Sequence, residues 1–260
     1  MLIDTHAHLC EDKLYPFAED IVHNFTNDGL EAIICPGTNH ITNTRTLELC
    51  SRFDKVFGAL GVHPLYSDHW DKDLLALIDQ GLDNPKVVAV GEIGLDDHYH
   101  EIPLDKQIPV LLEQLNLAKI HNLPVIFHTR DVWDTFLDFL SANHDLVTSG
   151  VVHCFDGTID HVRKVLDLGL NVSFTGSITF AKDYLRDVVR YVPLDRFMIE
   201  TDSPYLVPKP VKNKVKINEP KYVCHVAECI AALRNMSVRK VIDMSTANTY
   251  QLFKRMNNNE

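Results

Sequence analysis

The chain has 260 residues, 45% of them hydrophobic, and a formal net charge of -11. This length and apolar content allow one sizeable core, and we expect a single domain over residues 1–260. The acidic balance argues against broad electrostatic capture of nucleic acid, although a local basic patch could still provide it.

Short β-rich runs recur along the chain, with helical patterns between them. We expect strands near residues 2–9, 31–37, 56–63, 87–95, 124–129, 150–155, 171–176 and 197–202. Several runs, such as AIICP and VVAVG, are almost continuously apolar, as in parallel strands buried on both faces. This α/β alternation predicts a (β/α)8 TIM-like barrel, with a doubly wound sheet as the alternative.

The segments between these runs have the spacing of amphipathic helices. An apolar stripe runs between Asp105 and Asn122. Asp131 is expected to N-cap the next helix. A further helix is expected to begin at about Thr158, with Gly169 placed to end it.

Six potential metal ligands stand at or near the ends of separate predicted strands. They are His6, His8, Glu92, His128, His153 and Asp202. The C-terminal ends of the strands of a (β/α)8 barrel meet at one mouth, where the active sites of this fold lie. Histidine and carboxylate ligands in this number suit two divalent ions, and we expect Mg²⁺, Zn²⁺ or Mn²⁺.

The spacing of these residues suggests their roles. His6 and His8 are two residues apart, so on a strand they point to one face. Glu92 follows an apolar run, would be costly to bury unpaired, and can bridge two ions. Asp202 can bind an ion and accept a proton from water as the general base, with Glu92 as the second choice. Each residue alone could also be a hydrogen-bonded core or turn residue.

Other residues are expected to contact substrate at the mouth. His128 and His153 end neighbouring predicted strands and can reach a second ion. His63, held extended by the proline after it, can donate to a phosphate. The Arg130 guanidinium suits phosphate, although an ion pair with Glu92 or Asp131 fits as well.

A lysine cluster follows the last predicted strand, in PKPVKNKVKINEPK. It contains Lys209, Lys212, Lys214, Lys216 and Lys221. In an acidic chain this cluster is the best candidate for holding a phosphodiester backbone, with a solvated loop as the simpler alternative. Pro220 is expected to begin a helix.

The sequence carries no targeting or membrane signal that we recognise. The N-terminal MLIDTHAH has no basic region followed by an apolar one, and no apolar run approaches the ~18 residues of a membrane span. The six cysteines form no CxxC pair, so reduced thiols are expected. We therefore expect a cytoplasmic protein without membrane contact, and the sequence indicates no protein partner. The polar tail NNNE is expected to fray.

The motifs DTHAHL, GVHP, GEIGLD, HTRD, HCFDG, SFTGSITF, ETDSPYL and NEP, in this order, closely resemble the TatD family of metal-dependent deoxyribonucleases, a branch of the amidohydrolase-like barrels. The resemblance extends from Leu2 to about Phe253. It implies a barrel with two divalent ions, usually magnesium, that hydrolyses DNA and removes nucleotides from 3′ ends. Two stretches depart from the family pattern: VKNKVKI replaces an Arg-Gly-Lys run, and DHYHE, with His98 and His100, replaces a Tyr-rich segment.

The resemblance also implies a role for each matching position. By position, one ion is bound by His6, His8 and Asp202, the other by His128 and His153, with Glu92 bridging both and His63 contacting the substrate phosphate. The expected substrate is DNA, single-stranded or at 3′ ends. A two-metal amidohydrolase, lactonase or small phosphoesterase is the alternative, because the fold does not fix the substrate. A scaffold protein with a vestigial site is a third possibility, against which the complete ligand set argues.

Overall fold

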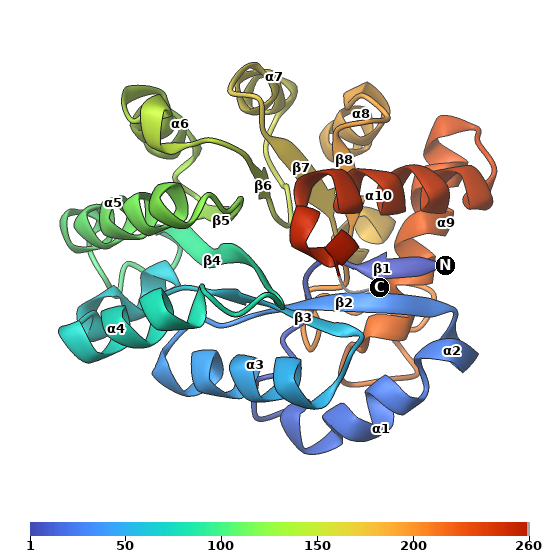
Figure 1. The fold of residues 1–260 in the computed structure, drawn as a ribbon. Coiled ribbons are helices and arrows are strands. Elements are labelled where there is room, and N and C mark those ends of the chain that lie inside the picture. Colours follow the sequence, from blue (N-terminus) through green and yellow to red (C-terminus); the bar gives the residue numbers. More distant parts are fainter. Residues whose placement is uncertain (259–260) are drawn as a thin grey trace.

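The computed structural model describes residues 1–258. Eight parallel strands form one sheet whose spatial order follows the chain (Figure 1). The strands are β1 (Leu2–Asp4), β2 (Leu30–Pro36), β3 (Val56–Leu60), β4 (Val87–Asp96), β5 (Val125–Arg130), β6 (Gly150–Val152), β7 (Asn171–Phe174) and β8 (Phe197–Ile199). This order is that of the predicted (β/α)8 barrel and excludes the doubly wound alternative, in which the order reverses at a switch point. Residues 259–260, the end of the tail expected to fray, lie outside the described residues.

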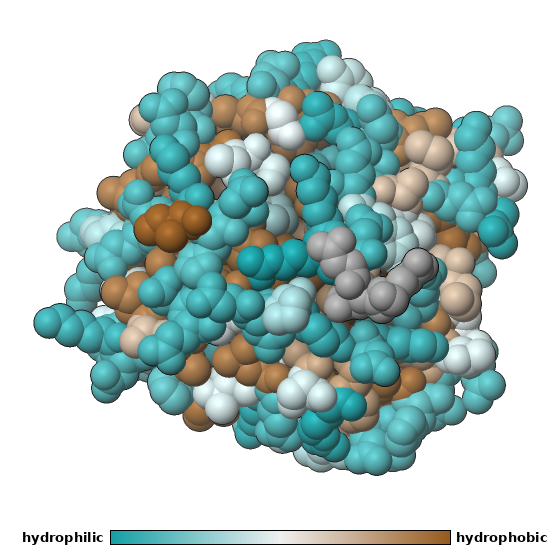
Figure 2. All heavy atoms as spheres, in the orientation of Figure 1, coloured by the Kyte–Doolittle hydropathy of each residue, from teal (hydrophilic) through white to brown (hydrophobic). Residues whose placement is uncertain are grey.

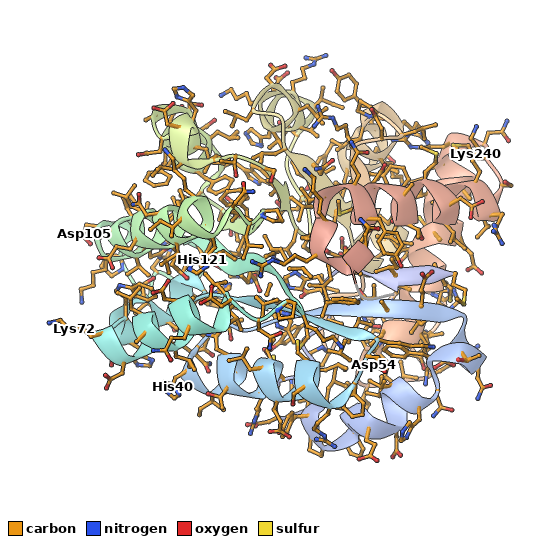
Figure 3. All side chains as sticks on the ribbon, viewed as in Figure 1. His40, Asp54, Lys72, Asp105, His121 and Lys240 are labelled. Atoms are coloured by element: carbon orange, nitrogen blue, oxygen red, sulfur yellow. The ribbon has the colours of Figure 1, made fainter. Side chains whose placement is uncertain are left out.

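Helices surround the strands (Figure 1). They are α1 (Ala18–His23), α2 (Phe25–Asp28), α3 (His40–Arg52), α4 (Lys72–Gly81), α5 (Leu104–His121), α6 (Trp133–Ala142), α7 (Ile159–Asp167), α8 (Asp183–Tyr191), α9 (Val223–Arg234) and α10 (Val238–Leu252). Figure 3 marks Asp105 and His121 near the two ends of α5, the helix predicted over 105–122.

The segments that follow β1 and β8 run side by side and close the barrel. The Thr5 N–H donates to the Ile199 carbonyl at 3.2 Å, and Ala7 forms a parallel β-bridge with Ser203. The first and last strands are thereby joined beyond their regular ends. As a result, two parts of the chain almost 200 residues apart meet at the mouth.

The barrel interior is apolar and is closed at the N-terminal end of the strands. Its side chains include Ile34, Phe57, Ile126 and Met198, packed with Phe253 and Met256 from the C-terminal segment. That segment is held in place by Arg255, which donates to the carbonyls of Leu82 and Val87 around the start of β4. In Figure 1 it is the red segment in front of the strands. The candidate ligands lie at the other end of the barrel, after the C-terminal ends of the strands.

Four strands end earlier than predicted at places that matter for the site, and two of them, β3 and β6, end at Leu60 and Val152, before His63 and His153. β1 ends at Asp4 and β8 at Ile199, so His6, His8 and Asp202 lie just beyond regular strand. Asp202 itself has a left-handed backbone, with φ of 54°. The side chains still converge, since the backbones beyond β1 and β8 stay hydrogen-bonded to each other.

Of the three predictions for the ends of α6 and α7, two are confirmed and one is wrong. Thr158 caps α7 by accepting from the His161 N–H, and Gly169 follows the helix with φ of 78°. Asp131 does not cap α6: Val132 holds that position without a side-chain bond. Asp131 adopts φ of 56° and turns its carboxylate toward a histidine of the preceding loop instead.

The end of the lysine-rich loop follows the prediction. A 3₁₀ helix begins at Pro220 and leads directly into α9. The face of the molecule that carries α10 and the C-terminal segment is covered mainly by hydrophilic side chains (Figure 2). Among the described residues, no helix combines the length and apolarity needed to cross a bilayer.

Candidate metal centre

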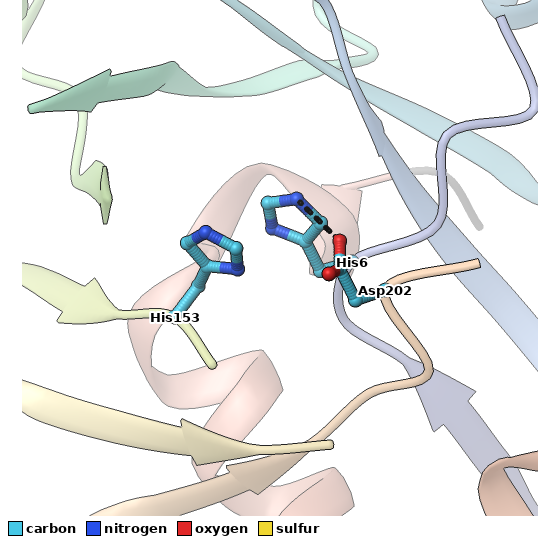
Figure 4. A group of neighbouring side chains, drawn as sticks. All are labelled: His6, His153 and Asp202. Carbon is cyan, nitrogen blue, oxygen red and sulfur yellow. Dashed lines mark ion pairs between the residues drawn. The ribbon is translucent and has the colours of Figure 1, made fainter. Parts of the chain in front are cut away.

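All six candidate ligands meet at the mouth of the barrel. Three overlapping groups of side chains, whose ligand atoms lie within 4.8 Å of one another, contain His6, His8, Glu92, His128, His153 and Asp202, together with His63. Figure 4 shows three of them: the rings of His6 and His153 are stacked 4.0 Å apart, and the Asp202 carboxylate faces His6 at 3.8 Å. The C-terminal ends of the strands thus gather side chains from the whole length of the chain.

Glu92 lies at the centre of this cluster and is 3% exposed. Its Oε2 is 3.3 Å from His6 Nε2 and 3.5 Å from His8 Nε2. Its Oε1 is 2.9 Å from His128 Nδ1 and 2.8 Å from His153 Nε2. Each carboxylate oxygen therefore serves one pair of histidines, and the carboxylate separates the cluster into two halves.

Within each half, two imidazole nitrogens point at each other. The Nε2 atoms of His6 and His8 are 3.1 Å apart, and His128 Nδ1 is 3.3 Å from His153 Nε2. Two neutral rings that present lone pairs to each other repel, unless a proton or a cation lies between them. Next to a buried carboxylate, both pairs fit a cation.

The opposite nitrogens of three of these rings face oxygen acceptors. The acceptors are the Pro36 carbonyl for His8, the Asp96 carboxylate for His128 and the Glu200 carboxylate for His153, at 3.3, 2.9 and 3.4 Å. Because these oxygens only accept, the facing nitrogens of His8 and His128 carry the hydrogens in the neutral rings, whereas Nδ1 of His153 lies near Glu200 without a hydrogen bond. The lone pairs of His8 and His128 are then directed to the centre, as in histidines that bind metals.

Asp96 and Glu200 are site residues that the sequence patterns did not single out. Glu200 is 1% exposed and also accepts from the Cys154 N–H at 2.7 Å and the Ser173 hydroxyl at 2.6 Å. The signal was present: Asp96 stands four residues after Glu92 and Glu200 two before Asp202, spacings at which side chains of a strand share a face.

His63 differs from the other histidines of the cluster. Its Nδ1 accepts a hydrogen bond from the Leu65 N–H at 3.2 Å, so the hydrogen of the neutral ring is on Nε2. Burial lowers the pKa of this ring to about 3, which keeps it neutral. Its Nε2 faces Glu92 Oε1 at 3.6 Å. This ring presents an N–H to the centre where His8 and His128 present lone pairs, and it can donate to an anion.

Both central carboxylates are held in the ionised form. Burial alone would raise the pKa of Glu92, but electrostatic interactions with the surrounding histidine rings, His153 first, outweigh it and hold that pKa well below its usual value. Burial is likewise outweighed at Asp202 by the hydrogen bond to His8, which lowers its pKa. Two negative charges buried among ring nitrogens form a site for divalent cations.

A cavity of about 520 Å³ opens above the cluster. Its walls include His63 and Arg130, as predicted, together with Tyr99 and Tyr205. The Arg130 guanidinium lies 5.3 Å from the centre of the Tyr99 ring, and within residues 1–258 it forms no ion pair with Glu92 or Asp131. It remains free for an anionic substrate.

The lysine loop lies outside the walls of this cavity. Lys209, Lys212, Lys214 and Lys216 are exposed between β8 and α9, and none pairs with a carboxylate in the described part of the chain. His98 and His100 are surface residues: they lie 2.6 Å from Asp131 and 3.0 Å from Asp97. All six cysteines are free thiols.

Comparisons with known proteins agree with this architecture. A family profile described as "TatD related DNase" matches residues 3–254. An uncharacterised metal-dependent hydrolase of Bacillus subtilis, YabD, is 36% identical over 98% of this chain and 99% of its own. A protein of Rahnella sp. named "3'-5' ssDNA/RNA exonuclease TatD" is 34% identical over 96% of this chain and 95% of its own. The crystal structure of YjjV, a TatD homologue of Escherichia coli, superposes with a TM-score of 0.90 at 31% identity, covering 97% of this chain and 98% of that one.

Proposed function

The chain belongs to the family of TatD-related DNases and is a metal-dependent hydrolase; from this premise we propose that it cleaves phosphodiester bonds of single-stranded DNA, removing nucleotides from the 3′ end at a two-metal site. The observation that carries the two-metal part is the position of Glu92, with one oxygen on each pair of histidines. The substrate part is supported by the Rahnella relative, named for a 3'-5' exonuclease activity on single strands.

The residues divide between the two halves of the cluster. His6, His8 and Asp202 would hold one ion, His128 and His153 the other, and Glu92 both. When bound, such ions supply positive charge against the phosphate and make water more acidic. His63 donates from Nε2 to a phosphate oxygen, and Asp202, which is 14% exposed at the edge of the cavity, accepts a proton from the attacking water.

The proposed reaction is tested by the products of a 5′-labelled single-stranded oligodeoxynucleotide. We expect a ladder that shortens from the 3′ end and needs an added divalent ion. The same preparation is tested on a panel of amides, lactones and small phosphoesters. Hydrolysis of one of these, without any cleavage of the oligonucleotide, would replace the proposed function with the small-molecule alternative.

Removal of metal is expected to abolish hydrolysis and to lower the melting temperature. The reason is that a ligand bound only by the folded state, at a free concentration of ~100 times Kd, stabilises that state by about 2.7 kcal/mol. The metal-free protein is reconstituted with Mg²⁺, Mn²⁺ or Zn²⁺ separately. For the ion that restores activity, elemental analysis should find two ions per chain. Full activity at one ion per chain would contradict the bridging role of Glu92.

The lysine loop is expected to hold the nucleic acid backbone. Replacing Lys209, Lys212, Lys214 and Lys216 together by Ala should weaken binding and flatten its dependence on salt, by about 0.7 in the log–log slope for each phosphate of a single strand that is no longer neutralised. The matched control replaces four exposed lysines elsewhere, Lys55, Lys119, Lys240 (Figure 3) and Lys254. Equal salt slopes in the two variants would assign the loop to solvated surface.

A further inference from the structure

Two partly exposed tyrosines, Tyr99 and Tyr205, flank the candidate metal centre. Tyr99 follows β4 and is 54% exposed; Tyr205 follows β8 and is 42% exposed. Both line the cavity above the cluster. The exposed part of a large ring beside an active site does not contribute to the core. Such a ring is placed to contact a molecule that enters the cavity.

Each of these rings has a cation over it, supplied by another segment of the chain. Arg130, at the end of β5, lies 5.3 Å from the centre of the Tyr99 ring, and Lys13, in the loop after β1, lies 5.3 Å from the centre of the Tyr205 ring. A flat ring with a positive charge over it offers one nucleotide a surface for its base and a cation for its phosphate.

Other contacts hold both rings in place. The Tyr205 hydroxyl donates to Glu11 at 2.6 Å, and its ring lies 6.2 Å from that of His8. The Tyr99 ring meets the edge of His98 at 4.6 Å, and His98 is in turn paired with Asp131. Rings that are oriented before binding lose little conformational entropy when a base stacks on them.

The two tyrosines lie on opposite sides of the mouth. In a barrel whose eight strands follow chain order, β4 and β5 lie across from β8 and β1. Glu92 and its histidines lie between them. A strand of nucleic acid that crosses the mouth from one tyrosine to the other therefore passes over the cluster.

We propose that Tyr99 with Arg130 and Tyr205 with Lys13 form two nucleotide clamps, which stack the bases on either side of the phosphate to be cleaved. This inference rests on the proposed function, and it restricts the substrate at the clamps to unpaired nucleotides. A base inside a duplex has both faces covered by its neighbours and cannot stack on either tyrosine.

The test pairs ring removal with base removal. Tyr99→Ala and Tyr205→Ala are assayed on a single-stranded oligodeoxynucleotide and on versions with an abasic terminal or penultimate 3′ nucleotide. Each Ala variant should lose roughly 5- to 150-fold in kcat/KM on the intact strand, the usual effect of one stacked base. Each should lose nothing further when the base that its ring holds is already missing.

Conservative and distant variants separate stacking from other effects. Tyr99→Phe and Tyr205→Phe keep the ring and should restore cleavage, although the latter loses the bond to Glu11. Tyr191→Ala is the matched control: Tyr191 is 45% exposed and paired with Arg163, but it lies at the end of α8, away from the mouth.

The outcomes distinguish this inference from the function on which it rests. Ala variants that cleave like the wild type, or losses that simply add to those of the abasic strand, would overturn the clamps and leave the nuclease intact. A wild-type enzyme that cleaves no oligonucleotide would overturn the proposed function and the clamps with it.

Discussion

Glu92→Gln is expected to lose bound metal and hydrolytic activity together. The amide has the shape of the carboxylate but no charge, and it offers one oxygen where Glu92 places one against each pair of histidines. The pair of histidines that lies next to the amide nitrogen of the glutamine then faces N–H hydrogens instead of an oxygen lone pair. Metal content and hydrolysis of the single-stranded oligonucleotide are measured on the same preparation.

The control for this change is Glu19→Gln on α1, an exposed carboxylate that pairs with Arg52 at 3.1 Å. It should keep both metal and activity. Thermal melting in the presence of a chelator shows whether the Glu92→Gln variant is folded. The variant has no buried charge at position 92, so its fold needs no bound cation to balance that charge. A folded variant that binds two ions per chain would show that Glu92 does not hold them together.

The sequence was sufficient to bring the six candidate ligands to one place. Runs such as VVAV and PVIF identify strands buried on both faces, and the first polar residue after such a run emerges at the mouth of the barrel. Glu92, His128 and His153 were found in this way, and the structure gathers them with His6, His8 and Asp202. The hydrophobic pattern predicts which strand a residue follows. The order of the strands around the barrel then determines which other residues lie next to it.

The sequence could not supply what depends on distances between atoms. The bridging position of Glu92 was expected, but the distances of 2.8–3.5 Å from its two oxygens to the four histidines were not, because they depend on the stagger of the strands around the barrel. A close approach of β4 and β5 illustrates the point: a Cβ at Gly94 would collide with the His128 carbonyl oxygen. The tautomer of His63 likewise follows from a turn that brings the Leu65 N–H to its ring.

Loop conformation was the other limit. Aspartate is a residue type that often caps helices. At Asp131, however, the left-handed backbone and the ion pair with His98 turn the carboxylate away from α6. The sequence did not mark Tyr99 and Tyr205 as candidate site residues, because exposed tyrosines are common on loops. These two tyrosines differ from other exposed tyrosines in combining two features: they lie across the barrel from each other, and a cation lies over each ring. Both features arise from contacts between segments far apart in the chain.

Asp202→Asn is expected to separate metal binding from proton transfer. Asp202 Oδ1 lies 3.4 Å from His8 Nε2 and 3.8 Å from His6 Nε2, so the side chain stands at the edge of one half of the cluster. The asparagine oxygen can still serve as a ligand beside these two rings, and part of the metal should be retained. It cannot accept a proton from water, so kcat should fall by at least the ~10²–10⁴-fold typical of a lost general base.

Metal content and oligonucleotide hydrolysis are compared with those of Asp187→Asn, an exposed aspartate on α8 that pairs with Arg190. This control should match the wild type in both. If Asp202→Asn hydrolyses at a near-normal rate with full metal, Asp202 is not the base, and Glu92 is then the remaining carboxylate of the cluster able to accept the proton. If activity falls only in proportion to the metal lost, Asp202 acts as a ligand alone. A loss of rate far beyond the loss of metal, in a protein with normal melting, is the result that assigns it both tasks.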